Sequence, residues 1–256
     1  MRPDPFSWTA HPEAALGLLA LVAAYVWVAR RYRPERWRIG VFAGAVALLA
    51  ATAFTPLDAL SFHVLIAHLL QNVVLAEWAP ALLVLAVPPA LAAEVARARP
   101  FRALTHPGVA LPLWLGVYFA WHLPVAYDAA LRHPATLLHL EHAMYLGAGF
   151  LLWWPALQDA PWRLSLQARA TYLFAAFLFC SPLGLLLALL PDAVYASYAG
   201  GFPEWGLSAL ADQQIAGILM ASAQAVVFFA AFAYFFFRFL AEEEREPAPS
   251  GSAPPA

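Results

Sequence analysis

Long apolar runs separated by short polar turns repeat along most of the 256 residues. A helix needs about 20 apolar residues to cross the hydrocarbon core of a bilayer, so these runs predict membrane-spanning helices. Seven are expected, at residues 14–30, 39–55, 60–87, 110–131, 136–157, 168–190 and 208–239. Pro80 lies inside the third run, where it removes a backbone donor, and the helix is expected to bend or to end early there.

The arginines are unevenly distributed between the turns. Twelve of them follow the first, third, fifth and seventh runs, whereas only Arg2 and Arg132 fall on the other side. Cytoplasmic loops of membrane proteins carry an excess of basic residues. The expected orientation therefore places the N-terminus outside and the C-terminus in the cytoplasm.

Composition supports a membrane protein and excludes a soluble domain. The chain is 63% hydrophobic and only 12% charged, with a mean hydropathy of +0.67. Its single cysteine, Cys180, excludes a disulfide framework and a paired-thiol metal motif. We expect an all-α polytopic bundle at residues 1–241 and a disordered, acidic and proline-rich cytoplasmic tail at residues 242–256. Nothing in this composition predicts a nucleic-acid partner.

Histidines and acids are concentrated at one predicted depth of the membrane. An ionisable side chain in hydrocarbon is costly and usually faces the bundle interior, a partner or a watery cavity. In the expected orientation, the outer ends of four helices carry His68, His122, the group His139, Glu141 and His142, and finally Asp212. This common depth predicts a functional cluster rather than isolated packing residues.

Helical phase, at about 100° per residue, orders the candidates. His68 and Asn72 share a stripe, whereas His63 points elsewhere and is better explained as an interfacial residue. His139 and His142 are three residues apart and can point at one centre.

The same phase argument applies to Glu141 and to the last helix. Glu141 points away from the direction shared by its neighbouring histidines, so we expect it to be a hydrogen-bond or salt-bridge partner. On the last helix, one polar face is shared by Gln213, Gly217, Met220 and Gln224, with Asp212 beside it.

Imidazoles with a carboxylate and a thioether are ligands for copper or zinc, and the thioether favours cuprous ion. The residues alone leave this choice open. An intramembrane zinc hydrolase is a second hypothesis, in which Glu141 or Asp212 takes the proton of a zinc-bound water, although the H-E-x-x-H spacing is absent. A haem protein with His68 and His122 as axial ligands is a third.

Four stretches carry more specific motifs. They are WHLPVAYDAAL at Trp121 to Leu131, LHLEHAMYL at Leu138 to Leu146 followed by Trp153, Trp154 and Pro155, DQQIAGILM at Asp212 to Met220, and HLLQNVVLAEWAPALLVLAVP at His68 to Pro88. They resemble WHxPxxYxxAL, HxxEH with a paired-tryptophan ending, DQxxAGxxM, and HMxQH with a proline segment. These are motifs of the CtaG family of bacterial cytochrome c oxidase assembly factors.

The resemblance implies a multi-pass protein of the bacterial inner membrane that helps deliver copper to the oxidase and is not an enzyme. Its implied partners are oxidase subunits, the lipid bilayer and a periplasmic copper donor. The metal groups that it implies are His68, His122, His139 and His142, with Glu141, Asp212 and Met220 in support. Copper is favoured over zinc on this basis.

The chain departs from the family pattern in the first histidine motif. Leu69 and Asn72 stand where the family commonly has methionine and a second histidine, and Ala221 stands where a tryptophan often follows the last methionine. Asparagine is a poor copper ligand. This leaves three hypotheses. The protein binds metal through fewer groups, it uses His63 as a ligand instead, or it is a metal-free chaperone for oxidase subunits on the same scaffold.

Overall fold

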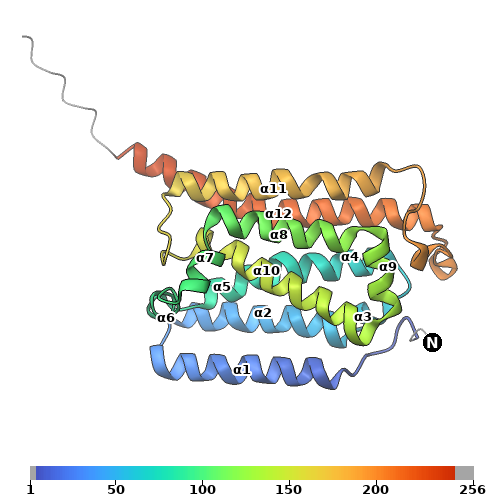
Figure 1. The fold of residues 1–256 in the computed structure, drawn as a ribbon, viewed down its shortest axis with the longest axis horizontal. Helices are drawn as coiled ribbons and strands as arrows, with labels where there is room; N and C mark the ends of the chain where they lie inside the picture. The colour runs from blue at the N-terminus through green and yellow to red at the C-terminus, as the bar shows by residue number, and fades with distance from the viewer. Residues whose placement is uncertain (1–3, 246–256) are drawn as a thin grey trace, which may run out of the picture.

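The computed structural model describes residues 4–245, and the structure is 81% helix with no strand in the part that it describes. The helical segments are α1 (Pro12–Tyr32), α2 (Arg36–Phe54), α3 (Pro56–Ser61), α4 (Leu65–Val73), η1 (Val74–Trp78), α5 (Ala79–Ala86), α6 (Pro89–Val95), α7 (Arg99–Leu104), α8 (Pro107–His122), α9 (Pro124–Arg132), η2 (Pro134–Leu138), α10 (His139–Leu157), α11 (Leu166–Leu189), η3 (Ala196–Tyr198), η4 (Pro203–Trp205) and α12 (Ala209–Glu243). The long helices lie along one common axis (Figure 1). The prediction of an all-helical bundle is confirmed.

Five helices of the described chain are long and apolar enough to cross a membrane, as a multi-pass membrane protein requires. They are α1, α2, the continuous run from α4 to α5, α11 and α12, and a sixth results if α8 and α9 form one bent span. α10 also runs lengthwise (Figure 1), but its first turn is polar and carries His139, Glu141 and His142. The count of seven spans and the orientation of the termini stay predictions.

Pro80 is accommodated within the third run without ending the helix. Proline clashes with the carbonyl group four residues earlier, here that of Ala76, and cannot bond to it. The backbone widens into the π-helical turn η1 just before the proline, and the Ala76 carbonyl accepts a hydrogen bond of 3.2 Å from the Trp114 indole instead. The helix then continues to Ala86, so of the two outcomes expected at Pro80, a bend or an early end, the early end does not occur.

The predicted fourth span is broken at Leu123, between α8 and α9. Leu123 precedes Pro124 and has an extended backbone, with ψ of 130°, as residues before proline prefer. The two helices meet at 71°. His122 therefore ends α8, while α9 crosses the end of the bundle (Figure 1).

Glycines allow two close helix contacts near the centre of the bundle. A Cβ atom at Gly149 of α10 would lie 2.2 Å from the Ala76 carbonyl oxygen, and one at Gly217 of α12 would lie 2.5 Å from the Gly184 carbonyl oxygen of α11. Small residues at such points let helix backbones approach closely in membranes. The first contact fixes α10 against η1, and the second fixes α12 against α11.

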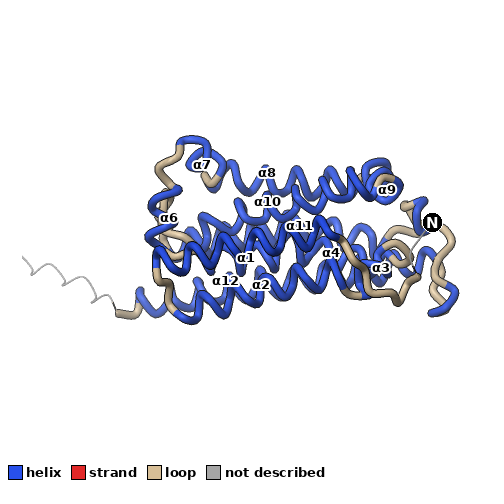
Figure 2. Tube along the Cα trace, turned by 90° about the horizontal axis from the view of Figure 1, so that it is seen from below, coloured by secondary structure: helices blue, strands red, loops and turns tan. Residues whose placement is uncertain are grey.

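The segment between α11 and α12 closes the end of the bundle at which α3 and α9 lie, and we call this the α9 end. Phe202 of this segment packs on Val64 and Ala67. Figure 2 shows α3 and α9 at the same end of the bundle, opposite α6 and α7. At the other extreme, α12 continues through Glu243, so the first two residues of the predicted tail are helical. Residues 246–256 lie outside the described residues.

Candidate functional site

Buried polar side chains gather at the α9 end, inside the bundle. His68 of α4 and Glu141 of α10 are fully buried, and His122 at the end of α8 is 4% exposed. The His142 ring of α10 lies with its centre 6.4 Å from that of His68. Tyr127 of α9 packs on both His68 and His122, with ring centres 4.7 and 6.0 Å away. We call His68, His122, Glu141 and His142 the buried cluster.

The hydrogen bonds of His68 define its tautomer. Its Nδ1 lies 3.0 Å from the Tyr198 hydroxyl, which donates its proton to the Ser61 carbonyl oxygen at 2.5 Å. The Nδ1 of a neutral His68 ring must therefore carry the hydrogen and donate it to Tyr198. The Nε2 atom consequently presents a lone pair, 3.8 Å from Glu141 Oε1.

His122 has the same tautomer for a simpler reason. Its Nδ1 lies 2.8 Å from the carbonyl oxygen of Tyr118, which can only accept a hydrogen bond. The Tyr145 hydroxyl lies 3.2 Å from the same nitrogen. In the neutral ring Nε2 therefore presents a lone pair here too. Histidines that bind metals commonly donate their other ring N–H to a backbone carbonyl in this way.

Asn72 holds Glu141 in place. Its side-chain amide donates a 3.2 Å hydrogen bond to Glu141 Oε1, and both side chains are buried. The asparagine that replaces the histidine usual in the family therefore orients the carboxylate of the cluster. This contact matches the expectation that Glu141 is a hydrogen-bond partner.

Several buried polar atoms of this region have no hydrogen-bond partner. They are Nε2 of His68, His122 and His142, Oε2 of Glu141, Oδ1 of Asn72 and the hydroxyl of Tyr127. A buried polar atom without a partner costs about 1–3 kcal/mol, so such a concentration calls for an explanation. Within residues 4–245, however, no three side chains of His, Cys, Asp or Glu stand in an arrangement ready to hold a metal ion.

The family model described as cytochrome c oxidase caa3 assembly factor (Caa3_CtaG) matches residues 23–242. The chain belongs to this family. No curated protein and no solved structure matches it. The match includes the whole buried cluster, and the resemblance inferred from the four motifs is confirmed.

Two tyrosines of this family member complete the site from the segment between α11 and α12. Besides Tyr198, Tyr195 donates a 3.0 Å hydrogen bond to the carbonyl oxygen of His122. Burial raises the pKa of Tyr195 above its usual value, so the phenol keeps the proton that it donates. Asp128 of α9 accepts hydrogen bonds from the backbone of Ala196 and Ser197 at 3.1 and 2.8 Å and thereby fixes this segment.

The tyrosines were not among the residues expected from the sequence. Their signal was the polar stretch VYASY between two apolar runs, and only the fold brings it over the cluster.

Two histidines lie away from the cluster: His139, which was expected to belong to it, and His63, which was expected to be an interfacial residue. The side chain of His139 is 46% exposed, and its Nε2 lies 3.6 Å from Glu13 Oε1 of α1. His63 packs on Phe202 instead. The fold therefore brings together three of the four histidines that the family resemblance implied as metal groups, and His139 is separated from them.

The residues of α12 that were expected to support the metal groups make contacts other than with the histidines of the cluster. Asp212 accepts hydrogen bonds from the backbone N–H groups of Leu65 and Ile66 at 2.7 and 3.1 Å, so it caps the N-terminus of α4 from 147 residues away. Gln213 accepts a hydrogen bond from the Val194 backbone. Met220 is fully buried within the apolar core.

A second polar group lies deeper, between α8, η1 and α12. Gln224 donates hydrogen bonds of 2.6 Å to Glu77 Oε1 and of 2.7 Å to the Tyr118 hydroxyl. Glu77 is fully buried inside the bundle. The predicted polar face of α12 is thus turned inward.

Proposed function

We propose that the protein is a non-catalytic inner-membrane assembly factor that binds a copper ion at the buried cluster and supplies it to a nascent cytochrome c oxidase. The observation that carries this proposal is that Nε2 of His68, His122 and His142 is buried and has no hydrogen-bond partner. For His68 and His122, the hydrogen bonds at Nδ1 show that Nε2 carries the lone pair in the neutral ring.

The donor set fits copper as cargo. Imidazole nitrogens bind copper well, and the nearby Glu141 carboxylate can balance the charge of the cation. In the described residues, no three candidate side chains are already arranged to hold a metal ion, so copper binding requires small rotations of the cluster side chains. A site that is not fully pre-formed supports transient binding, which transfer to another protein requires.

The arginine distribution indicates which side of the membrane the site faces. If the arginine-rich turns face the cytoplasm, the α9 end faces the periplasm, and the cluster lies just inside that surface. A periplasmic donor could then load the site, and an oxidase subunit in the same bilayer could receive the ion. Both partners are part of this proposal.

A metal-free chaperone for oxidase subunits is the second candidate. Asn72 favours it, since the amide fills the position of a usual histidine and is engaged with Glu141. In this alternative the cluster only stabilises the fold. Metal content distinguishes the two functions.

The test is copper analysis of purified protein in lipid nanodiscs after exposure to cuprous ion and removal of excess metal. We expect stoichiometric copper in the wild type and a loss of at least tenfold in retained copper for His68→Ala, His122→Ala and His142→Ala. His133→Ala, which removes an exposed histidine, is the matched control and should retain copper.

Oxidase activity in a deletion strain should follow copper retention across these variants. Wild-type protein that binds no copper yet restores the oxidase would overturn the copper function and favour the chaperone. Cluster variants that bind copper as well as the control would show that the ion binds elsewhere.

A further inference from the structure

A cavity of about 580 Å³ lies between α1, α2 and α10 at the α9 end. It forms because α1 stands away from the bundle and has no buried residue of its own. A second, more apolar space of about 670 Å³ continues along α1 toward α6, and Leu21, Ala143 and Leu146 line both spaces. The bundle therefore has an open flank beside α10.

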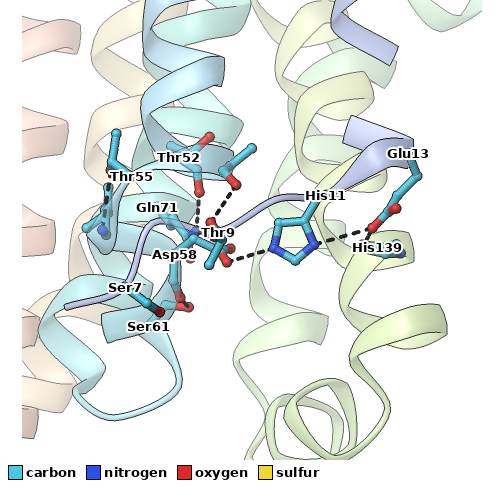
Figure 3. Close-up of polar contacts among 12 residues, drawn as sticks. Ser7, Thr9, His11, Glu13, Thr52, Thr55, Asp58, Ser61, Gln71 and His139 are labelled. Atoms are coloured by element: carbon cyan, nitrogen blue, oxygen red, sulfur yellow. Dashed lines mark hydrogen bonds and ion pairs between the residues drawn. The ribbon is translucent and has the colours of Figure 1, made fainter. Parts of the chain in front are cut away.

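The mouth of this cavity is lined by carboxylates and imidazoles. Glu13 Oε1 lies 3.4 Å from His11 Nδ1 and 3.6 Å from His139 Nε2, so one carboxylate joins α1 to α10. His11 Nε2 lies 2.9 Å from Asp58 Oδ2 on the other side (Figure 3). Among the described residues, no arginine lines the cavity. A concave surface that carries one sign of charge concentrates ions of the opposite sign, here cations.

The inner end of the cavity reaches the buried cluster. His142 lines the cavity, and its buried Nε2 has no hydrogen-bond partner. The same ring lies 6.4 Å from His68, centre to centre. A cation that enters at Glu13 thus meets a free imidazole nitrogen before it reaches the other two histidines.

We infer that the cavity between α1 and α10 is the loading route for the cationic cargo, and that Glu13, flanked by His11 and His139, receives the ion at its mouth. This inference rests on the proposed function. It assigns His139 to the entrance rather than to the cluster, and it adds Glu13 and His11, which precede the part of the chain that matches the family.

The route requires water in the cavity, and thiol labelling tests this independently of any metal. Ala143→Cys in a Cys180→Ala background places a thiol on the cavity wall, while Met144→Cys places one on the outward side of the same helix. In nanodiscs, a positively charged, membrane-impermeant methanethiosulfonate should modify Cys at 143 at least tenfold faster than at 144. A negatively charged reagent of similar size should lose most of this advantage.

Equal labelling at the two positions would mean that lipid or another apolar group fills the space, and the route would be excluded. Selective labelling at 143 with no preference for the cationic reagent would overturn the role of the charged mouth.

The role of Glu13 is tested by the rate at which the protein takes cuprous ion from a chromophoric chelator. In water, a single carboxylate at about 6 Å attracts a passing cation enough that removing its charge should slow association about threefold. We expect this for Glu13→Gln, with an unchanged equilibrium affinity because the cluster is intact. Glu204→Gln makes the same charge change at an exposed position outside the cavity and should have no effect.

The two proposals fail in different ways. If the wild type takes up cuprous ion and the Glu13→Gln variant takes it up at the same rate, the route is overturned and the cluster remains the binding site. A wild type that takes up no cuprous ion overturns copper as the cargo of both, whereas the labelling result still reports whether the cavity is open to water.

Discussion

Asp212 offers the sharpest test of how the site is held, because it supports α4 from another helix. The first N–H groups of a helix have no partner within it, and those of Leu65 and Ile66 both donate to the Asp212 carboxylate. α4 carries His68 one turn further on. Asp212→Ala should therefore weaken the fold and displace a histidine of the cluster.

The magnitude follows from the two hydrogen bonds. A hydrogen bond to a charged group contributes about 1.5–3 kcal/mol, and water replaces it poorly here because Leu65 is only 1% exposed. Losing both bonds should lower the free energy of unfolding by about 3 kcal/mol. For a protein of this size that corresponds to a fall of roughly 6–12 °C in Tm. Asp212→Asn keeps one neutral acceptor and should lose about half as much.

Thermal unfolding in nanodiscs, followed by tryptophan fluorescence, measures the effect. Asp192→Ala is the matched control: it removes an exposed carboxylate, and only the backbone carbonyl of Asp192 is used, as an acceptor for Gln213. The expected order of Tm is wild type and Asp192→Ala, then Asp212→Asn, then Asp212→Ala. If Asp212→Ala lowers Tm no more than the control does, the long-range cap does not stabilise α4 and the reasoning is refuted.

Three further substitutions test the packing and the polar networks by the same assay. Gly149→Ala should cost about 1–3 kcal/mol because its Cβ would collide with a backbone carbonyl, whereas Gly147→Ala, which points into open space, should change stability by less than about 0.5 kcal/mol; equal effects would contradict the proposed helix contact. Gln224→Leu should cost about 1–3 kcal/mol by leaving the buried Glu77 carboxyl without its donor, and adding Glu77→Leu should recover part of this loss. Additive losses would show that the two residues are not coupled. Tyr198→Phe should cost about 1 kcal/mol, since it removes the hydroxyl that joins the histidine of α4 to α3, and an unchanged Tm would show that this bond does not stabilise the fold.

The separation of His139 from the cluster shows where helical phase is insufficient. His139 and His142 are about 60° apart around α10, so either could face the interior. The neighbouring α1, which stands away from the bundle, gives His139 a partner in Glu13, while the side of His142 turns toward His68. Position along one helix cannot show which neighbour covers each side of it.

Asn72 and Asp212 make the same point for polar residues. The sequence marks both as unusual in an apolar helix, which is a strong sign of an interior role. It does not show that Asn72 orients a carboxylate of α10 or that Asp212 caps α4, because both partners are distant in the chain. The Tyr195 and Tyr198 contacts depend equally on how the α11–α12 segment folds back.

The sequence by itself determined that the protein is an all-helical membrane bundle of the caa3 assembly-factor family, and it predicted a group of histidines and acids near one end. These features follow from the length and apolarity of each segment and from local motifs, all of which are properties of neighbouring residues. Only the tertiary structure decided which imidazoles meet, which nitrogen each leaves free and where the bundle is open. Those outcomes depend on helix kinks, close glycine contacts and hydrogen bonds between segments more than 100 residues apart, and no local pattern encodes them.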